Sequence, residues 1–468
     1  MPLRRRTIHV CLLSVLAAVF AAGQRAPQPS LTAAHLAQNA QAYLVSPAAL
    51  RDQPGQFPRE GAVQLYHLRY EQVVPSGLSA LLVQRVFQIR SRAGAELFAP
   101  DNLWYDNGRG RFQLVRAEVW RRHGAHAPYA IAGQGKDLGD LPGFAAGTQP
   151  RRLGLPRLHA GDRVSVIYAV LPDTGTNWSL LAGHFIGNMF ALRDSFATEK
   201  VHYVLAAHES MAVSAAGLPA PRLGTGAGGL RTWEWDATDL PAFFQSADGP
   251  AITAVSPFVQ VSSFTTWAAM TRWYGGLLHE RAQVAPALAA DLRRIAAGPA
   301  GTNEDARAIV ERVWHYLSNH LSYRGVEDGV HAYVPAPVSE VFQSGQGDCK
   351  DGALLLVTWL RMLGVQADLA LVRTPAMGPI APANAQGQVA ATMAAFDHAL
   401  VYIPATGQWI DTTAPHLPEG DLPQGDRNGL ALLVRRDQTK LVHVQEASAV
   451  AATSAAGAVR LTAAHVPQ

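Results

Sequence analysis

Residues 345–364 read GQGDCKDGALLLVTWLRMLG, and this stretch decides how the second half of the chain folds. Its apolar run, 353–363, is long enough for a buried helix, and Gly364 is a typical C-terminal stop. Cys349 then lies in the first turn, where free backbone N–H groups and the positive end of the helix dipole favour a thiolate. Lys350 adds a second cationic influence. The pattern therefore predicts an activated cysteine at a helix N-terminus.

Two later segments supply candidates for a general base and for the group that orients it. Residues 396–403, FDHALVYI, read as a strand with His398 at its start, and residues 409–413, WIDTT, read as a second strand. The PATG turn between them predicts a hairpin, and His398 and Asp411 are 13 residues apart. Adjacent antiparallel strands would place Asp411 beside His398 and leave the other ring nitrogen facing Cys349. This is the nucleophile–base–orienter order of a catalytic triad.

Each of these residues also has an ordinary structural explanation. A single His in a strand is commonly a core or surface residue, and a single Asp at a strand end is commonly a turn cap. The conjunction of Cys349, His398 and Asp411 favours catalysis. A metal site that used Cys349 and His398 would lack further ligands at the usual spacing, so neither a metal nor another cofactor is expected.

The N-terminus is typical of a secretory leader. Three arginines at 4–6 precede an uncharged apolar run at 10–22, and AAG at 21–23 provides a small-residue cleavage site. The alternative is an uncleaved anchor, but the run is shorter than the roughly 20 residues that a membrane span needs. We expect export to the periplasm or the extracellular space.

Removal of this leader changes the charge and the cysteine count. The chain has 39 Lys and Arg against 36 Asp and Glu, and the leader holds three of the arginines and no acid, so the mature protein is neutral. A neutral chain without basic clusters does not predict nucleic-acid binding. Of the two cysteines, Cys11 leaves with the leader, and Cys349 alone cannot form an intramolecular disulfide. Cys349 is then either a reactive thiol or a buried, inert cysteine.

Short β-type runs fill the region 61–255. One example is the alternation of Val164, Val166 and Tyr168 after a Gly-Asp turn, and further runs are separated by similar turn signals. Several short strands without a long helical pattern predict an antiparallel sandwich.

Helical periodicity begins near residue 264. Apolar residues at three- and four-residue steps predict one helix face, formed by Trp267, Met270, Trp273, Tyr274 and Leu277. A second helix is predicted to start at Thr302, which makes a Thr-x-x-Asp cap with Asp305. The domain boundary is therefore placed around 250–265. The full division is a signal peptide at 1–23, a linker at 24–60 with a short helix around 31–43, a β-domain at 61–255, a cysteine domain at 256–435 and a C-terminal tail at 436–468.

Three segments carry a family resemblance. GDCKD at 347–351, with its helix ending in LGV, resembles the Cys motif of bacterial transglutaminase-like domains. DHALV at 397–401 resembles the His motif of these domains, and WIDTT at 409–413 resembles their Asp motif. Upstream, LSYRGVE at 321–327 and YVP at 333–335 resemble the lead-in to the Cys motif.

The resemblance extends over residues 60–435. The β-rich half resembles the N-terminal domain of unknown function that precedes such domains in many exported bacterial proteins. Gly352 departs from the pattern, which has a larger, often basic residue at that position.

The resemblance implies an α+β protein in which an antiparallel β-sandwich-like domain precedes a papain-like, transglutaminase-core domain. Cys349 would attack an amide, His398 would transfer protons, and Asp411 would hold His398. The backbone N–H of Cys349 would form part of the oxyanion hole. Tyr323 is a candidate for a second donor, and an aromatic core residue is the alternative explanation of this tyrosine.

Several functions remain open at this point. The thioester could pass to an amine or to water, so acyl transfer (transamidation or deamidation) and a papain-like cysteine peptidase use the same triad. A second hypothesis is a non-catalytic envelope binding or scaffold protein with an idle cysteine domain. A protein or peptide substrate is the expected partner, and envelope or extracellular proteins are further candidates.

Overall fold

The structure is a computed structural model that describes residues 31–98, 102–106, 110–122, 129–130, 133–137, 148–172, 181, 183–244, 246, 249–298, 305–325, 329–418, 420–435 and 441–444. The predicted signal peptide at 1–23 and most of the predicted tail at 436–468 lie outside the described residues. Within the described ranges, no helix combines the length and the apolar character that crossing a bilayer requires.

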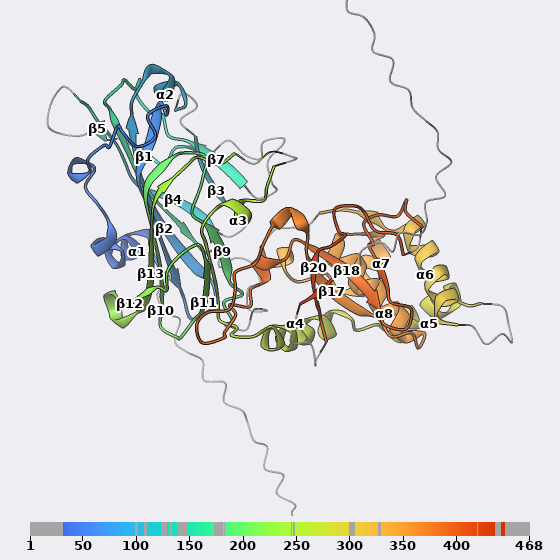
Figure 1. The fold of residues 1–468 in the computed structure, drawn as a ribbon. Coiled ribbons are helices and arrows are strands. Elements are labelled where there is room, and N and C mark those ends of the chain that lie inside the picture. Colours follow the sequence, from blue (N-terminus) through green and yellow to red (C-terminus); the bar gives the residue numbers. More distant parts are fainter. Residues whose placement is uncertain are drawn as a thin grey trace, which may run out of the picture. The chain divides into compact units, whose positions relative to one another are not determined.

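The first part of the described chain is built on one large sheet (Figure 1). Neighbouring strands are antiparallel, except that β1 and β10 run parallel. The predicted β-rich domain is confirmed, and the parallel pair is a departure that side-chain alternation cannot reveal, because it depends on a long connection. The strand order is β12-β13-β10-β1-β2-β8-β4-β5, with bounds Arg222–Thr225, Arg231–Leu240, Thr198–Ala207, Ala62–Val73, Ser79–Ile89, Arg163–Leu171, Arg111–Trp120 and Tyr129–Ala130.

Two small sheets and short helices complete this part. β14 falls in the range predicted for the cysteine domain, 256–435, but it pairs with β9 and β11. The strands of the first part therefore continue to Ser262. The small sheets are β11-β14-β9 (Ala212–Ala216, Phe258–Ser262, Asn188–Ala191) and β3-β7-β6 (Asn102–Asp106, Thr148–Arg152, Lys136–Asp137), and the helices are α1 (Ala33–Asn39), α2 (Arg92–Glu96) and α3 (Ile252–Val255).

The described part of the predicted linker, 31–60, packs on the large sheet. The helix α1 lies within the predicted short helix at 31–43. After it, the Tyr43 hydroxyl donates a hydrogen bond of 2.9 Å to Glu234 of β13. The backbone N–H of Val45 donates one of 2.9 Å to Gln84 of β2. This segment therefore covers part of the sheet and is more than a linker.

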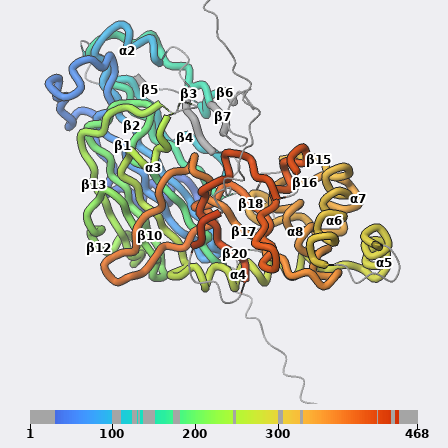
Figure 2. Tube along the Cα trace, turned by 45° about the vertical axis from the view of Figure 1, so that its right-hand side comes forward, coloured from blue at the N-terminus to red at the C-terminus, as the bar shows by residue number. Residues whose placement is uncertain are grey.

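The second part is an α+β domain with an antiparallel sheet in the order β19-β18-β17-β20-β21. In two views, helix α8 lies between β17 and β18 on one side and α6 and α7 on the other (Figures 1 and 2). The strands are Gln408–Ile410, His398–Ile403, Asp368–Arg373, Leu430–Leu433 and Val442–His443 in sheet order, and β15 (Ser322–Tyr323) pairs in parallel with β16 (Gln346–Gly347). The helices are α4 (Trp267–Arg281), α5 (Pro286–Ile295), α6 (Ala306–His320), α7 (Val338–Ser344) and α8 (Cys349–Met362).

The predicted helices of this domain form, with one corrected start. The periodicity near residue 264 corresponds to α4. The second helix, α6, begins at Ala306, because Asp305 is its N-cap and accepts a hydrogen bond of 2.9 Å from the backbone N–H of Ala308. Thr302, the predicted cap, lies outside the described residues. The aspartate of the predicted capping pair therefore caps the helix itself.

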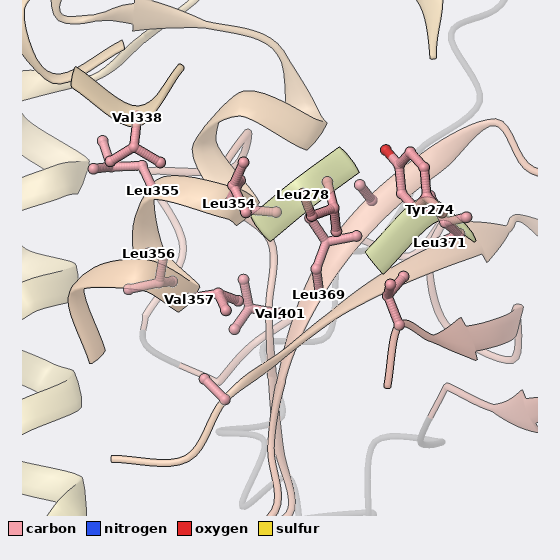
Figure 3. Packing of buried hydrophobic residues seen from close by; sticks show 14 of the residues in the cluster. Tyr274, Leu278, Val338, Leu354, Leu355, Leu356, Val357, Leu369, Leu371 and Val401 are labelled. Carbon is pink, nitrogen blue, oxygen red and sulfur yellow. The ribbon is translucent and has the colours of Figure 1, made fainter. Parts of the chain in front are cut away.

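Helix α8 is the central element of this domain, and it is buried over most of its length. Residues from Lys350 to Leu360 are all buried, as a helix that is apolar on nearly every face requires. Figure 3 shows Leu355 next to Val338 of α7, and Val357 next to Val401 of β18. The buried helix places its own N-terminus, with Cys349, at the end of the sheet where β18 starts.

The segment between β17 and β18 is held by a buried arginine. Arg373 is 1% exposed, and its guanidinium donates hydrogen bonds of 2.6–3.0 Å to four backbone carbonyls. These carbonyls belong to Met377, Gly378, Pro379 and Ala395. Burial lowers the pKa of Arg373, and the charge of Asp397 opposes this shift. The arginine thus fixes the chain just before His398.

Residues of the β-rich part also hold this segment. The backbone N–H of Met393 donates to the carbonyl of Ile186 at 2.9 Å. The Ser262 hydroxyl donates to the carbonyl of Ala391 at 2.6 Å, and the backbone N–H of Ala390 donates to the Ser214 hydroxyl at 3.1 Å. The segment that leads to His398 is therefore hydrogen bonded to strands β11 and β14 and to the loop before β9.

The close packing around Gly352 accounts for a glycine at the position where the family pattern has a larger residue. A Cβ on Gly352 would lie 2.5 Å from Oγ1 and 2.9 Å from Cβ of Thr412, both shorter than real contacts, and 3.0 Å from Cδ2 of Leu321. Helix α8 therefore meets the segment after β19 at the distance that only glycine permits. A larger residue would move Asp411, which precedes Thr412, away from the helix that carries Cys349.

We predict that Gly352→Ala destabilises the protein by roughly 1–3 kcal/mol, because the added methyl overpacks this contact. The control is Gly276→Ala in α4, where a Cβ would meet nothing within 4 Å. There, alanine should stabilise the helix by up to about 1 kcal/mol. Urea unfolding of both variants measures the difference, and equal effects at the two glycines would contradict the close contact.

Candidate functional site

Cys349 is the first residue of α8, and two buried aspartates fix the turn that carries it. Asp348 is the N-cap, and its Oδ1 accepts hydrogen bonds from the backbone N–H groups of Lys350 (3.1 Å) and Asp351 (3.2 Å). In return, Asp351 Oδ2 accepts from the backbone N–H of Asp348 at 3.0 Å, and its Oδ1 accepts from Ala336 at 2.8 Å. This reciprocal capping satisfies free donors of the first turn and holds the Cys349 backbone in place.

The charge of Lys350 is directed at Asp348. The sequence predicts that the charge of Lys350 acts on Cys349. In the structure, the Lys350 ammonium instead forms a buried ion pair with Asp348 Oδ2. Burial raises the pKa of Asp348, the charge of Lys350 lowers it, and the Asp351 carboxylate raises it further. Lys350 therefore offsets a buried carboxylate beside the cysteine.

The predicted hairpin brings His398 and Asp411 together. β18 and β19 pair antiparallel, with Val401 opposite Ile410, so the first residue of β18 and the residue after β19 lie at neighbouring positions. Nε2 of His398 lies 3.3 Å from Oδ1 of Asp411. The side chain of Cys349 also interacts with this imidazole closely enough to raise the pKa of His398. The three residues singled out in the sequence thus meet at one point.

The surroundings of His398 favour its protonated form. Burial alone lowers the pKa of His398, but the hydrogen bonds and negative charges of Asp411 and Cys349 raise it to about 10. An ordinary histidine has a pKa of about 6.5, so this protonation stabilises the fold fully below about pH 6.5. The contribution is lost as the pH rises through about 10. At neutral pH the ring therefore carries a proton on each nitrogen.

Asp411 is kept ionised by its hydrogen bonds. Burial raises its pKa, but the hydrogen bonds from His398 and Thr413 hold the pKa of Asp411 below its usual range. The Thr413 hydroxyl lies 2.8 Å from Oδ1 and 3.0 Å from Oδ2 of Asp411, and the Thr413 backbone N–H donates to Oδ1 at 2.8 Å. Thr413 therefore fixes the orientation of the carboxylate that faces His398, a role that the sequence did not indicate.

A second carboxyl group, Asp426, lies at the same imidazole. Its Oδ2 is 3.7 Å from Nε2 of His398, and the residue is 6% exposed. Burial is the largest cause that raises the pKa of Asp426, to about 6, and the neighbouring Asp411 carboxylate also raises it while the charge of His398 lowers it. Sequence reasoning missed this residue, because GDRNG at 425–429 has the composition of an ordinary turn.

The structure places Tyr323 on the surface beside the Cys349 loop. Tyr323 is in β15, opposite Gly347 of β16, and its side chain is 57% exposed. The alternative explanation as an aromatic core residue is therefore wrong. The role of Tyr323 as an oxyanion donor stays a prediction. It is supported by the pairing of Tyr323 with Gly347, which lies two residues before Cys349.

The spacing at His398 would also fit a small metal ion. Nε2 of His398 and one carboxylate oxygen each of Asp411 and Asp426 lie within 4.8 Å of one another. A metal ion would bind the unprotonated nitrogen of His398, so metal binding at this spacing would compete with the Nε2 proton.

We predict that Thr413→Val slows alkylation of Cys349 by iodoacetamide at pH 7 by roughly tenfold or more, because a hydrogen bond to a charged group is worth about 1.5–3 kcal/mol. Loss of the hydroxyl raises the pKa of Asp411 and weakens the support of the imidazolium. The control is Thr358→Val in α8, since the Thr358 hydroxyl is buried without a hydrogen-bond partner among the described residues. Equal rates in the two variants would contradict this role of Thr413.

Two family models match the chain in the order that the sequence predicts. Residues 75–244 match the Domain of Unknown Function DUF3857, and residues 293–413 match the transglutaminase-like superfamily. Comparison with curated proteins gives no match.

Among solved structures, the chain is similar to a "putative protease" from Parabacteroides distasonis ATCC 8503. The two share 13% identity and a TM-score of 0.59 over 82% of this chain and 72% of the other. This likeness shows the fold alone.

Two further solved structures have TM-scores too low to carry an argument. A "putative cysteine protease" from Cytophaga hutchinsonii gives 0.20 at 13% identity, over 48% of this chain and 71% of the other. An M1 zinc metallopeptidase from Deinococcus radiodurans gives 0.23 at 14% identity, over 44% and 45%. With the family matches and the fold, residues 293–413 form a domain of the transglutaminase-like superfamily, of papain-like fold, which a DUF3857 domain precedes.

Proposed function

We propose that this protein is a cysteine-dependent enzyme that transfers acyl groups of protein or peptide amides through a thioester on Cys349. The observation that carries the proposal is the contact of both Cys349 and Asp411 with the imidazole of His398, inside a transglutaminase-like domain. A purely structural domain has no need of a nucleophile, a base and an orienting carboxylate on one ring.

In the first step, the Cys349 thiolate attacks the carbonyl carbon of a carboxamide and a C–S bond forms. The backbone N–H of Cys349 stabilises the oxyanion, because the first N–H of a helix has no acceptor within the helix. The C–N bond then breaks as His398 gives the proton of its cysteine-facing nitrogen to the departing nitrogen. The products are the thioester and ammonia, from a glutamine side chain, or an amine, from a peptide bond.

In the second step, neutral His398 takes a proton from the acceptor, which attacks the thioester carbonyl. The C–S bond breaks, Cys349 leaves as the thiolate, and His398 is again the imidazolium. An amine acceptor gives transamidation, and water gives deamidation or peptidase activity. The transglutaminase-like match favours glutamine donors, and the peptidase is the alternative that uses the same thioester.

Asp411 acts through His398 in both steps. Its carboxylate accepts the hydrogen bond of Nε2–H, so that the other ring nitrogen is directed at the sulfur. Asp411 remains ionised throughout, because its hydrogen bonds keep its pKa low. Its negative charge stabilises the imidazolium present before the first step and after the second.

The location follows from the leader at 1–23. We propose export to the periplasm or the extracellular space, where envelope or extracellular proteins would supply the amide donor. A protein with one cysteine in the mature chain would keep that thiol free of intramolecular disulfides in such a compartment.

The alkylation rate of Cys349 as a function of pH tests this proposal. We expect rapid reaction with iodoacetamide well below pH 8, and a loss of at least tenfold in His398→Ala, since an unperturbed thiol has a pKa of about 8.5. His315→Ala, an exposed histidine on α6, is the matched control and should react like the unchanged protein. Reaction only above pH 8, unaffected by His398→Ala, would remove the case for an enzyme and favour a binding or scaffold role.

Product analysis distinguishes the two branches. With a glutamine-containing peptide and a primary amine, acyl transfer releases ammonia and attaches the amine, whereas a peptidase shortens the peptide. Cys349→Ser should abolish either reaction. Peptide cleavage without amine attachment or ammonia release would establish the peptidase alternative.

A further inference from the structure

Asp426 enters the site from a part of the chain that the transglutaminase-like match does not reach. The match ends at residue 413, and Asp426 lies in the connection from β19 to β20. A turn fixes this connection: the backbone N–H of Asp426 donates to the carbonyl of Pro423 at 3.1 Å, and Gly429 donates to the carbonyl of Asp426 at 3.2 Å. The turn continues into β20, which is paired with β17, so the backbone of Asp426 is held by the sheet that carries His398.

The side chain of Asp426 is buried and points at the imidazole edge. Its Oδ2 is 3.7 Å from Nε2 of His398, on the nitrogen that also lies 3.3 Å from Asp411. This oxygen has no hydrogen-bond partner among the described residues. A buried carboxyl oxygen without a partner is costly, and such groups persist mainly where function requires them.

We propose that Asp426 is a second positioning carboxyl which, together with Asp411, holds the Nε2 edge of the His398 imidazolium. The proposal rests on the proposed function, because holding the imidazolium matters only if His398 serves Cys349. The Nε2–H group of His398 points between the two carboxyl groups. Rotation of the ring away from either carboxyl group would weaken the electrostatic attraction to it. The ring is then fixed in the orientation that presents its other nitrogen to the sulfur.

The two carboxyl groups differ in their partners, and this assigns them different roles. Asp411 accepts hydrogen bonds from two donors of Thr413, the backbone N–H and the hydroxyl, and stays ionised. Oδ2 of Asp426 has no donor among the described residues, the hydrogen bond of Asp426 with Asp411 raises the pKa of Asp426, and like charges this close oppose its ionisation. Asp411 is therefore the permanent acceptor, and Asp426 adds its charge only when it loses its proton.

The groups that face Asp426 are few. His398 lowers its pKa, whereas Asp411 and Asp397 raise it, after burial as the largest cause, to about 6. Asp397 itself is bound to the backbone N–H and hydroxyl of Thr374, at 2.8 and 2.5 Å. The neighbouring Arg427 directs its Nε to the carbonyl of Leu422 at 3.0 Å. Asp426 therefore gains a negative charge on passing from pH 5 to pH 7, which increases the attraction on the imidazolium.

The test compares the pH profiles of Cys349 alkylation in the unchanged protein, Asp426→Asn and Asp421→Asn. Asparagine has the shape of the protonated aspartic acid, so Asp426→Asn should match the unchanged protein at pH 5 and react roughly three- to tenfold more slowly at pH 7.5. Asp421 is an exposed aspartate of the same connection, and its variant should follow the unchanged protein at both pH values. If Asp426→Asn does not fold, Asp426→Glu replaces it and should keep the rise in rate between pH 5 and pH 7.5.

Several results would overturn the proposal. An Asp426→Asn profile that matches the unchanged protein at every pH removes any role, and a uniform slowing at every pH indicates a merely structural one. If EDTA slows the unchanged protein, zinc restores its rate and Asp426→Asn responds to neither, the three side chains hold a metal instead. Failure of the proposed function gives a different result from failure of the Asp426 proposal alone. Cys349 of the unchanged protein would then be alkylated only above pH 8, and both proposals would be wrong.

Discussion

The contact between the first turn of α8 and the segment that follows β19 is the constraint on which the rest of the site depends. Gly352 and Thr412 meet at a distance that leaves no room for a Cβ on the helix. Because of this approach, Cys349 on the helix and Asp411 after the strand both reach the imidazole of His398. The burial of α8, its capping by Asp348 and the sheet beneath it all serve to keep this approach fixed.

Around this contact, the protein buries more carboxyl groups than cations. Asp348 is offset by Lys350 and by backbone donors, and Asp411 by Thr413 and His398. The imidazolium of His398 is thus part of a local balance of charge, which explains why its pKa is raised although burial opposes the charge. In the proposed mechanism, the imidazolium of His398 donates a proton to the leaving group that the attack of Cys349 releases.

Much of this site could be predicted from the sequence because its signals are local. The helix start at Cys349 and the hairpin with His398 and Asp411 follow from short patterns, and the fold and family were recognised from the same segments. The direction of the Lys350 side chain and the role of Asp426 could not be predicted, since each depends on which groups the folded chain brings near. The parallel pairing of β1 with β10 and the pairing of β14 with β9 escaped prediction for the same reason, because strand partners far apart in sequence leave no local pattern.

The most direct test of the account is the protonation state of His398, followed by nitrogen NMR of the histidine-labelled protein, with His398→Gln to assign the signal. Both ring nitrogens of His398 should stay protonated at pH 8, and the imidazolium should lose a proton near pH 10. In Cys349→Ala the loss should move to lower pH, because one of the two negative partners is removed. A ring that titrates near its ordinary pKa of about 6.5, and is unaffected by Cys349→Ala, would contradict the pairing of His398 with Cys349.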